Sequence, residues 1–438
     1  MFNLRIRLVG GAAILLAATV QAENWPQWRG PAFNGSTPEK NLPAQWSKSN
    51  NVAWSAALPG PSAATPVIWG DHVFVSSTDL QNQSLVAMAF NRKTGALLWS
   101  HKVSDGFRRD DRSNYASPSP ATDGQRVIFF YGNGAMAAFD FTGRKLWERN
   151  IQKDYGTFAF LWTFSSSPLL FQNRLYLQVL QRDVPVDGRG RTDGPNESYL
   201  LALNPATGQT LWRQVRHSDA VAESREAFST PIPNLSSPQQ EILIVGGDCI
   251  TGHDAATGRE LWRWGTWNPT RIGHWRLVPS PVAGKGVALA CAPKASPVFA
   301  VKTGGSGILP ESFVAWKSDP SSGVTSDVPT PLFYMDDFFI LSDLKKTLAR
   351  VEPSTGKIKW SIKTPGNAKY EASPTGADGR IFLMNFKGDV VIADAQRGEV
   401  LQNIQMGDPG DDQIRSTIAV SQGQLFIRTN RRLYCVGQ

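Results

Sequence analysis

Short apolar runs separated by polar turn residues form the main pattern of this chain, and the stretch 116–147 shows it clearly. Four such runs alternate there with three tight turns, at Asp123-Gly124, Gly132-Asn133-Gly134 and Thr142-Gly143. Gly, Asn and Asp supply the positive φ angles that short hairpin turns need, so the pattern predicts four antiparallel strands. One small sheet cannot bury both of its faces alone, and it therefore requires further copies of itself.

The same unit recurs along the chain, opened by Ser/Thr-Pro and closed by Thr-Gly-x-x-x-Trp. The openings are Thr65-Pro66, Ser117-Pro118, Ser167-Pro168, Thr230-Pro231, Ser280-Pro281, Thr330-Pro331 and Ser373-Pro374. Complete closings end at Trp99, Trp147, Trp212, Trp262 and Trp360, whereas the closing at Trp316 lacks Thr-Gly and the closing at Gln402 lacks Trp. A repeat of roughly 40–60 residues with four strands in each unit predicts a β-propeller.

The two ends of the repeat region predict how the ring closes. Seven complete units end near Met406, and the tail 413–436 supplies three more strands but no fourth. The segment Val52–Ser55 contains Trp54 and resembles the outer strand around Trp360. Pairing it with the last three strands would cover exposed sheet edges. We therefore predict an all-β fold, an eight-bladed propeller of four-stranded antiparallel blades over residues 51–438, closed by an N-terminal strand that completes the last blade.

Residues 1–22 have the pattern of a signal peptide. Arg5 and Arg7 precede an apolar run from Leu8 to Val20, and small residues at Val20-Gln21-Ala22 suit cleavage after Ala22. The apolar run is short for a membrane span, although an uncleaved anchor is the alternative. No other run is long enough to cross a bilayer, and no Cys follows for lipid attachment. We expect an exported protein, periplasmic or secreted, with no transmembrane segment after cleavage.

Residues 23–50 precede the first unit and are rich in Trp and Pro, with Trp25-Pro26 and Trp28 near the start. Pro lacks the backbone donor that a central strand needs, so this segment is expected to pack on the propeller rather than join a sheet. It is either a packed cap or an aromatic plug that meets a partner.

Two stretches interrupt the repeat. Gln181–Ser198 in the third unit mixes acidic residues with Gly and Arg, and we interpret it as a surface loop, with a calcium loop as the alternative. Ala295–Glu311 in the fifth unit is also predicted to be loop-like.

Charge and metal-binding residue types exclude several classes of function. A net charge of +8, or +6 without Arg5 and Arg7, is a mildly basic surface and does not indicate a nucleic-acid partner. The histidines form no zinc motif. Cys249, Cys291 and Cys435 cannot all pair, so either one disulfide or buried free thiols are expected. We expect a monomer.

The closest copies of the unit, Leu200–Trp212 and His253–Trp262, resemble the pyrroloquinoline-quinone (PQQ) repeat. This repeat builds the eight-bladed propellers of quinoprotein alcohol dehydrogenases and of the outer-membrane assembly factor BamB, and the resemblance covers the chain from about Asn51 to its end. In this resemblance the Trp would dock each outer strand on the neighbouring blade, and Thr-Gly would only form the turn.

The resemblance implies two classes of function. Similar enzymes hold PQQ against a Trp in the central channel, with calcium and a disulfide between adjacent cysteines. This chain has no adjacent cysteines and no carboxylates that match by motif, so no cofactor is expected, and PQQ with calcium is the alternative. Proteins like BamB are lipoproteins that bind protein partners, and this chain lacks the lipid-accepting Cys.

Geometry places a candidate binding site at the channel mouth, where the residues just before each opening would meet. These candidates are Tyr115, Trp162, Arg225, Glu226, Trp275, Arg276, Lys369, Tyr370, Glu371 and Arg415. Arg225, Arg276 and Arg415 would bind a carboxylate or phosphate, with Tyr115, Trp162 or Trp275 stacking on the ligand. The alternative is that Arg225–Glu226 and Lys369–Glu371 only neutralise one another. No catalytic or metal-binding residue is predicted.

The sequence therefore predicts an exported binding or scaffold propeller that takes a protein partner or a small anionic ligand. A periplasmic PQQ-dependent dehydrogenase is the alternative function.

Overall fold

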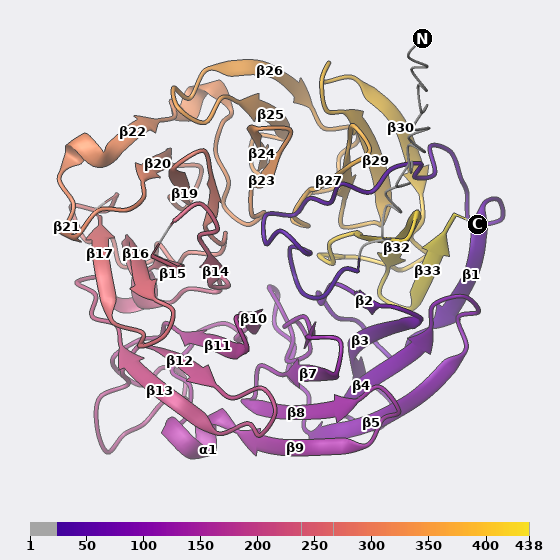
Figure 1. Cartoon of the computed structure of the whole chain (residues 1–438), viewed down its shortest axis with the longest axis horizontal. Helices are drawn as coiled ribbons and strands as arrows, with labels where there is room; N and C mark the ends of the chain where they lie inside the picture. Colours follow the sequence, from indigo (N-terminus) through magenta and orange to yellow (C-terminus); the bar gives the residue numbers. More distant parts are fainter. Residues whose placement is uncertain (1–23, 238, 266, 438) are drawn as a thin grey trace, which may run out of the picture.

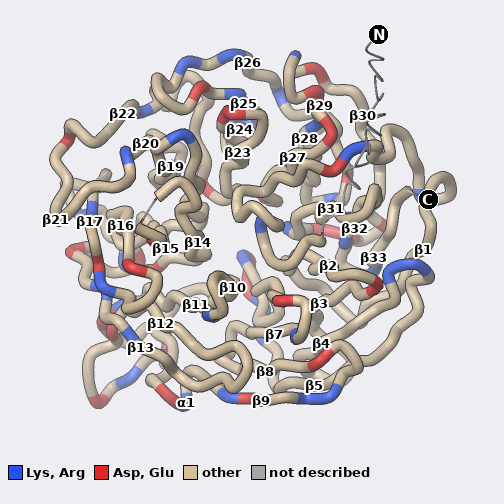
Figure 2. The backbone as a smooth tube through the Cα atoms, in the orientation of Figure 1, with Lys and Arg blue, Asp and Glu red and all other residues tan. Residues whose placement is uncertain are grey.

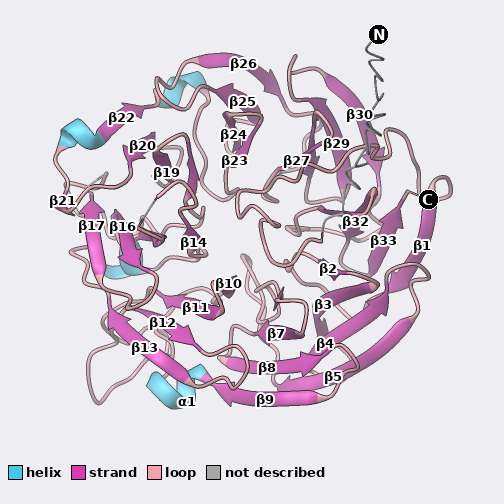
Figure 3. Ribbon diagram, in the orientation of Figure 1, coloured by secondary structure: helices cyan, strands magenta, loops and turns pink. Residues whose placement is uncertain are grey.

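Eight sheets surround a central axis, so the chain is an all-β, eight-bladed propeller as predicted (Figure 1). The computed structural model describes residues 24–437 apart from 238 and 266, and the predicted signal peptide lies outside the described residues. Each blade runs from a short inner strand at the axis to a longer outer strand. Within the described residues, helical structure is limited to α1 (Ile151–Tyr155) and short 3-10 turns at Ala222–Arg225, Glu311–Phe313 and Pro320–Ser322 (Figure 3).

The first four blades follow the chain in order. Blade one contains β2 (Val67–Trp69), β3 (His72–Asp79), β4 (Ser84–Asn91) and β5 (Leu97–Asp105). Blade two contains β6 (Ala121–Thr122), β7 (Arg126–Phe130), β8 (Ala135–Asp140) and β9 (Lys145–Asn150). Blade three contains β10 (Leu169–Phe171), β11 (Arg174–Val179), β12 (Tyr199–Leu203) and β13 (Thr210–Val215). Blade four contains β14 (Ile232–Pro233), β15 (Glu241–Gly246), β16 (Cys249–Asp254) and β17 (Glu260–Trp264), joined by β21 (Gly307–Ile308).

The remaining blades complete the ring. Blade five contains β18 (Val282–Gly284), β19 (Val287–Cys291), β20 (Val298–Lys302) and β22 (Val314–Lys317). Blade six contains β23 (Leu332–Tyr334), β24 (Asp337–Ser342), β25 (Thr347–Val351) and β26 (Ile358–Lys363). Blade seven contains β27 (Thr375–Ala377), β28 (Arg380–Met384), β29 (Asp389–Asp394) and β30 (Val400–Gln405). Blade eight contains β31 (Ala419–Ser421), β32 (Gln424–Arg428), β33 (Arg432–Val436) and β1 (Val52–Ala57).

The ring closes through the chain's N-terminal strand, which confirms the prediction. Strand β1 pairs antiparallel with β33, with Val52 opposite Val436 and Ser55 opposite Tyr434. The outer edge of β33, which would otherwise be open, is thereby covered.

The outer-strand Trp residues of six blades dock on the next blade, also as predicted. The Trp147 Nε1 donates to the Pro205 carbonyl at 2.9 Å, and a Cβ added to Gly208 would lie 2.7 Å from the Trp147 ring. The prediction that Thr-Gly only forms the turn is wrong, because its glycine also leaves the space that the ring occupies. The same contact joins Trp54 to Gly95, Trp99 to Gly143, Trp212 to Gly258, Trp316 to Gly356 and Trp360 to Gly398.

The interface between blades four and five departs from this rule because the fifth unit lacks Thr-Gly. Trp262 turns into its own blade, where its Nε1 donates to Glu241 Oε2 at 2.6 Å. Strand β21 pairs in parallel with β17, placing Gly307 opposite Trp262. The prediction of a loop-like Ala295–Glu311 is therefore partly wrong, since this stretch contains β20 and β21.

The Ser/Thr-Pro openings link the blades around the axis. The backbone N–H of Ser119 donates to Ser167 Oγ at 3.0 Å, and that of Ser167 donates to Thr230 Oγ1 at 3.0 Å. The opening of the second unit is Ser119-Pro120 rather than Ser117-Pro118, because Ser119 takes the linking position. The same hydrogen bond, from the backbone N–H of one opening to the hydroxyl of the next, joins Thr65 to Ser119, Thr230 to Ser280, Ser280 to Thr330 and Thr330 to Ser373.

The floor segment, residues 24–37, crosses the axis on one face of the ring. Gln27 exchanges side-chain hydrogen bonds with Leu170 in blade three, and Gly35 accepts from the N–H of Gly376 in blade seven. Blades three and seven lie opposite one another in an eight-bladed ring, so the segment spans the channel. Trp25 is fully buried and pairs with Ile68, and Arg29 donates to the Pro331 and Pro374 carbonyls at 2.9 Å each.

All three cysteines are free and buried. No helix of the described part of the chain is long and apolar enough to span a membrane. Basic and acidic residues are interleaved around the ring (Figure 2).

Candidate binding site in the axial pocket

A cavity of about 300 Å³ lies on the propeller axis, and all eight blades contribute to its lining. Trp28 of the floor segment also lines it. The Ser and Thr hydroxyls of the blade openings form a polar belt around it, and Phe228, Val278, Val328 and Leu344 add apolar surface. The charged lining residues are Arg112, Arg276, Lys294, Asp327, Asp343, Lys369, Glu371 and Arg415.

Half of the predicted site residues reach this pocket. Trp162, Arg276, Lys369, Glu371 and Arg415 line it. The structure places Tyr115, Arg225, Glu226, Trp275 and Tyr370 outside the lining. Tyr115 and Trp275 are half-buried against the hydrophobic core. Tyr370 is buried there too, and its hydroxyl donates to the Pro365 carbonyl at 2.9 Å.

The predicted Arg225–Glu226 pair does not form. Glu226 is fully buried and pairs with Arg182, while the Leu161 N–H donates to both of its carboxylate oxygens at 3.1 Å. Arg225 instead donates to the Ser218 and Ala220 carbonyls. The side chains of these consecutive residues point apart because Arg225 ends a 3-10 turn and Glu226 is extended.

The Lys369–Glu371 pair does form, and Arg415 strengthens it. Arg415 Nε lies 2.7 Å from Glu371 Oε2, and Lys369 Nζ lies 4.0 Å from Glu371 Oε1. Both cations are therefore partly neutralised by one buried carboxylate. This part of the pocket resembles the self-neutralised arrangement that the sequence offered as its alternative.

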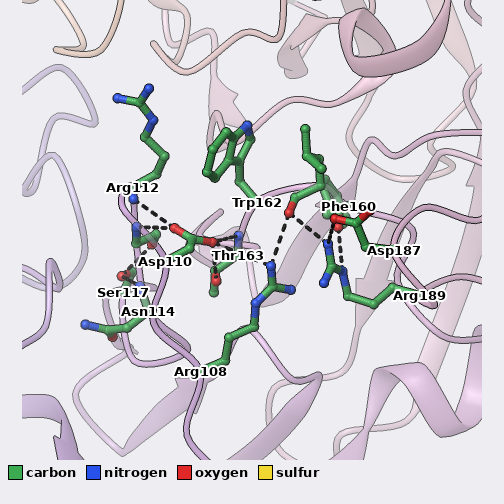
Figure 4. A network of polar contacts seen from close by, with 12 residues as sticks. Arg108, Asp110, Arg112, Asn114, Ser117, Phe160, Trp162, Thr163, Asp187 and Arg189 are labelled. Carbon is green, nitrogen blue, oxygen red and sulfur yellow. Dashed lines mark hydrogen bonds and ion pairs between the residues drawn. The ribbon is translucent and has the colours of Figure 1, made fainter.

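Arg112, which the sequence analysis missed, is a pocket cation that no protein carboxylate neutralises. Its guanidinium lies over the Trp162 ring at 5.3 Å. Within the described residues its side chain makes no ion pair and no hydrogen bond. Figure 4 shows it extending beside Trp162, away from Asp110. Its signal in the sequence was the Arg-Asp cluster 108–112, which lies before the second opening.

A hydrogen-bond network holds Arg112 and Trp162 in place. Asp110 accepts from the backbone N–H of Arg112 at 2.8 Å, and from the N–H and hydroxyl of Thr163 at 2.6 and 2.7 Å (Figure 4). Burial acts to raise the pKa of Asp110, but these hydrogen bonds outweigh it and the pKa lies below its ordinary value. Asp110 therefore stays ionised and fixes the two loops.

Trp162 is also held from a second direction. Its Nε1 donates to Glu223 Oε1 at 2.9 Å, and Arg276 Nη1 lies 3.6 Å from the same oxygen. One connected series of contacts thus joins Arg112, Trp162, Glu223 and Arg276. It presents an aromatic ring and two guanidinium groups to the pocket.

The acidic side of the pocket belongs to blade six and its flanking loops. Asp343 is 4% exposed, and its Oδ1 accepts from the Asp327 N–H at 3.0 Å. Burial, together with the neighbouring Asp327 and Glu371 charges, raises the pKa of Asp343 to about 6. The sequence analysis missed Asp343 because it follows β24, whereas only residues before the openings were considered.

The family is decided by a comparison of the whole sequence. A family model described as outer membrane protein assembly factor BamB matches residues 37–182 and 196–438. The chain belongs to the BamB family. The unmatched gap falls within the predicted insertion Gln181–Ser198, which is therefore an addition to this family's pattern.

Solved structures of BamB-family and dehydrogenase propellers share this fold. BamB from Moraxella catarrhalis is 14% identical, with a TM-score of 0.59 over 88% of this chain and 99% of that chain. A europium-containing methanol dehydrogenase is 11% identical, with a TM-score of 0.66 over 92% and 89%. The quinohemoprotein alcohol dehydrogenase from Comamonas testosteroni is 13% identical, with a TM-score of 0.62 over 95% and 81%. Comparison with curated proteins gives no match. This BamB-family chain is thus a PQQ-repeat β-propeller.

Two of the carboxylates that line the pocket already have protein partners. No three His, Cys, Asp or Glu side chains of the described residues are placed to hold a metal ion. Glu371 is occupied by Arg415, and Asp343 shares its Oδ1 with the Asp327 N–H. The basic and aromatic lining does suit an organic anion.

Proposed function

We propose that this chain is an exported binding protein whose axial pocket holds a small organic ligand with a carboxylate group. The observation that carries the proposal is the Arg112 guanidinium, held on Trp162 beside the pocket without a protein anion. An arginine can bind a carboxylate through two parallel hydrogen bonds, and the ring beneath it restricts its motion.

Arg276 supports the same ligand class. It lines the pocket and is largely buried, and its nearest carboxylate oxygen, Glu223 Oε1, already accepts from Trp162. A ligand carboxylate between Arg112 and Arg276 would meet two guanidinium groups and an aromatic surface. The floor segment supports a pocket that is closed at one end rather than an open channel, because it crosses the axis and its Trp28 lines the cavity.

Calorimetric titration with indole-3-propionate tests this proposal. We expect binding to the wild-type protein, and a loss of about tenfold or more in affinity for indole-3-propionamide or for Arg112→Ala, the usual cost of a charge-assisted hydrogen bond. Arg144→Ala is the matched control, because Arg144 is exposed and pairs with Asp140 outside the pocket. Equal binding of the acid and its amide to wild type, or no binding of either, would refute the proposal.

PQQ binding is the second candidate, favoured by the same basic and aromatic lining. Titration with PQQ, with and without calcium, followed by absorbance, separates the two. A stoichiometric spectral change that requires calcium would support the dehydrogenase, and a change independent of calcium would support PQQ as a bound anion only. A role in binding a protein partner rests on membership of the BamB family and not on the pocket.

A further inference from the structure

The axial pocket carries a negative group as well as positive ones. The Asp343 carboxylate accepts from backbone N–H groups, but no Lys, Arg or His nitrogen of the described residues lies within ion-pair distance of it. The side chain is 4% exposed and lines the cavity. A buried carboxylate without a cation is costly, so a positive group on a ligand would stabilise it.

The charges near Asp343 do not supply that cation. Asp327 and Glu371 are both negative, and each raises the pKa of Asp343. Lys369 and Arg415 are engaged by Glu371. The backbone N–H of Lys294 donates to Asp327 Oδ1 at 2.6 Å, and within the described residues the Lys294 side chain makes no ion pair with Asp343.

Asp343 and Arg112 belong to opposite sides of the ring. Asp343 follows β24 of blade six, and Arg112 lies in the loop that leads into blade two. Blades two and six are separated by three blades in either direction. A ligand that meets both residues must therefore carry its positive and negative groups at separate ends.

Between these two ends the pocket offers hydrogen-bond donors. The hydroxyl ring, formed by Ser119, Ser167, Thr230, Thr330 and Ser373, lines the cavity. Each hydroxyl accepts one backbone N–H from a neighbouring blade and donates to no acceptor within the described residues. Each thus retains a proton for a ligand, and this arrangement suits a chain of carbonyl oxygens.

We infer that the pocket takes a short peptide, with its terminal ammonium at Asp343, its carbonyl groups along the hydroxyl ring and its terminal carboxylate at Arg112. The inference rests on the proposed function, since the carboxylate end uses the same Arg112. It adds the positive end and the peptide class of the ligand.

Calorimetric titration with three related peptides tests it, namely trialanine, N-acetyl-trialanine and trialanine amide. Acetylation removes the ammonium group and amidation removes the carboxylate. In the wild-type protein each change is expected to weaken binding about tenfold or more. In Asp343→Asn the penalty for acetylation disappears and the penalty for amidation remains. In Arg112→Ala the pattern is reversed.

The variants are chosen to keep the fold. The Asn side chain retains an oxygen that can accept from the Asp327 N–H, and unchanged melting temperatures verify folding. Asp105→Asn is the control, because the side chain of Asp105 is 79% exposed and pairs with Lys102 outside the pocket.

The outcomes separate this inference from the proposed function. If N-acetyl-trialanine binds the wild type as well as trialanine does, or if Asp343→Asn keeps the preference for trialanine, the peptide assignment is wrong. Binding of indole-3-propionate that depends on Arg112 would still support the proposed function. If no peptide binds, the peptide assignment is also refuted. If indole-3-propionate does not bind either, the proposed function is refuted as well.

Discussion

At the residue scale, His253 links pH to stability through a buried neutral ring. Its Nδ1–H donates to the Gly258 carbonyl at 2.9 Å, and its Nε2 accepts from the Thr251 hydroxyl at 2.9 Å. Burial lowers the pKa of His253 from 6.5 to about 4. The unfolded chain therefore binds a proton between these values that the folded chain does not, and stability falls as the pH falls from about 6.5 to 4. The expected loss is about 3 kcal/mol.

Urea unfolding at pH 7 and pH 4 measures this loss in wild type and in His253→Gln. Gln cannot take up a proton, so the variant should lose less stability over the same interval. The carboxylates whose pKa burial raises, Glu226, Asp248 and Asp343, contribute the opposite slope to both proteins and cancel in the comparison. Equal acid sensitivity of the two proteins would contradict the assignment.

The residues of the site were only partly predictable. Position before an opening brings a residue near the axis, as for Arg276 and Arg415, but it does not fix the direction of the side chain. Tyr370 turns into the core because its ring is largely apolar and its hydroxyl finds a backbone carbonyl. Arg112 and Asp343 were missed because their approach depends on loop conformation and on which blades face one another.

At the element scale, the glycine of each Thr-Gly turn has two roles, and they can be separated. Gly208 has φ +72° and supports the Trp147 ring, whereas Gly379 has φ +71° and open space where a Cβ would point. Ala at either position pays the left-handed backbone penalty, but only Gly208→Ala also displaces a Trp. We expect Gly208→Ala to destabilise by about 1–3 kcal/mol more than Gly379→Ala, the usual cost of overpacking.

Urea titration followed by tryptophan fluorescence compares the two variants. Equal losses would show that the glycine serves the turn alone. A reduced loss in the double variant Gly208→Ala/Trp147→Ala, relative to the sum of the single losses, would identify the ring as the obstacle.

Individual blades were predictable because Gly, Asn and Asp in their turns specify the hairpin geometry through local sequence alone. The fifth unit was less so, since it lacks the Thr-Gly that marks the other turns. Its third strand, β20, and the added strand β21 are specified by pairing with β19 and β17, which are contacts between segments. The second opening was predicted two residues too early, at Ser117-Pro118, for the same reason. The linking role of Ser119 depends on its contact with Thr65 of blade one.

At the scale of the whole molecule, closure joins the two ends of the ring at one strand. Strand β1 completes blade eight by pairing with β33, and its Trp54 also packs on Gly95 of blade one. The Trp54 Nε1 donates to the Arg92 carbonyl at 2.6 Å. One side chain therefore secures both the last sheet and the interface between the last blade and the first. The stability of this closing sheet should be separable from that of the other blades.

Cys435 offers a direct measure of closure, because it lies opposite Trp54 in the β1–β33 pair and is fully buried. Trp54→Ala is expected to let β1 separate from β33, so that Cys435 becomes reactive toward a thiol reagent under native conditions while Cys249 and Cys291 stay protected. Trp147→Ala is the matched control, since it removes the same contact between blades two and three. Mass spectrometry of the labelled peptides identifies the cysteine modified. If Trp147→Ala exposed Cys435 as fast as Trp54→Ala does, the opening would be global rather than local to the closing strand, and the assigned role of Trp54 would be wrong.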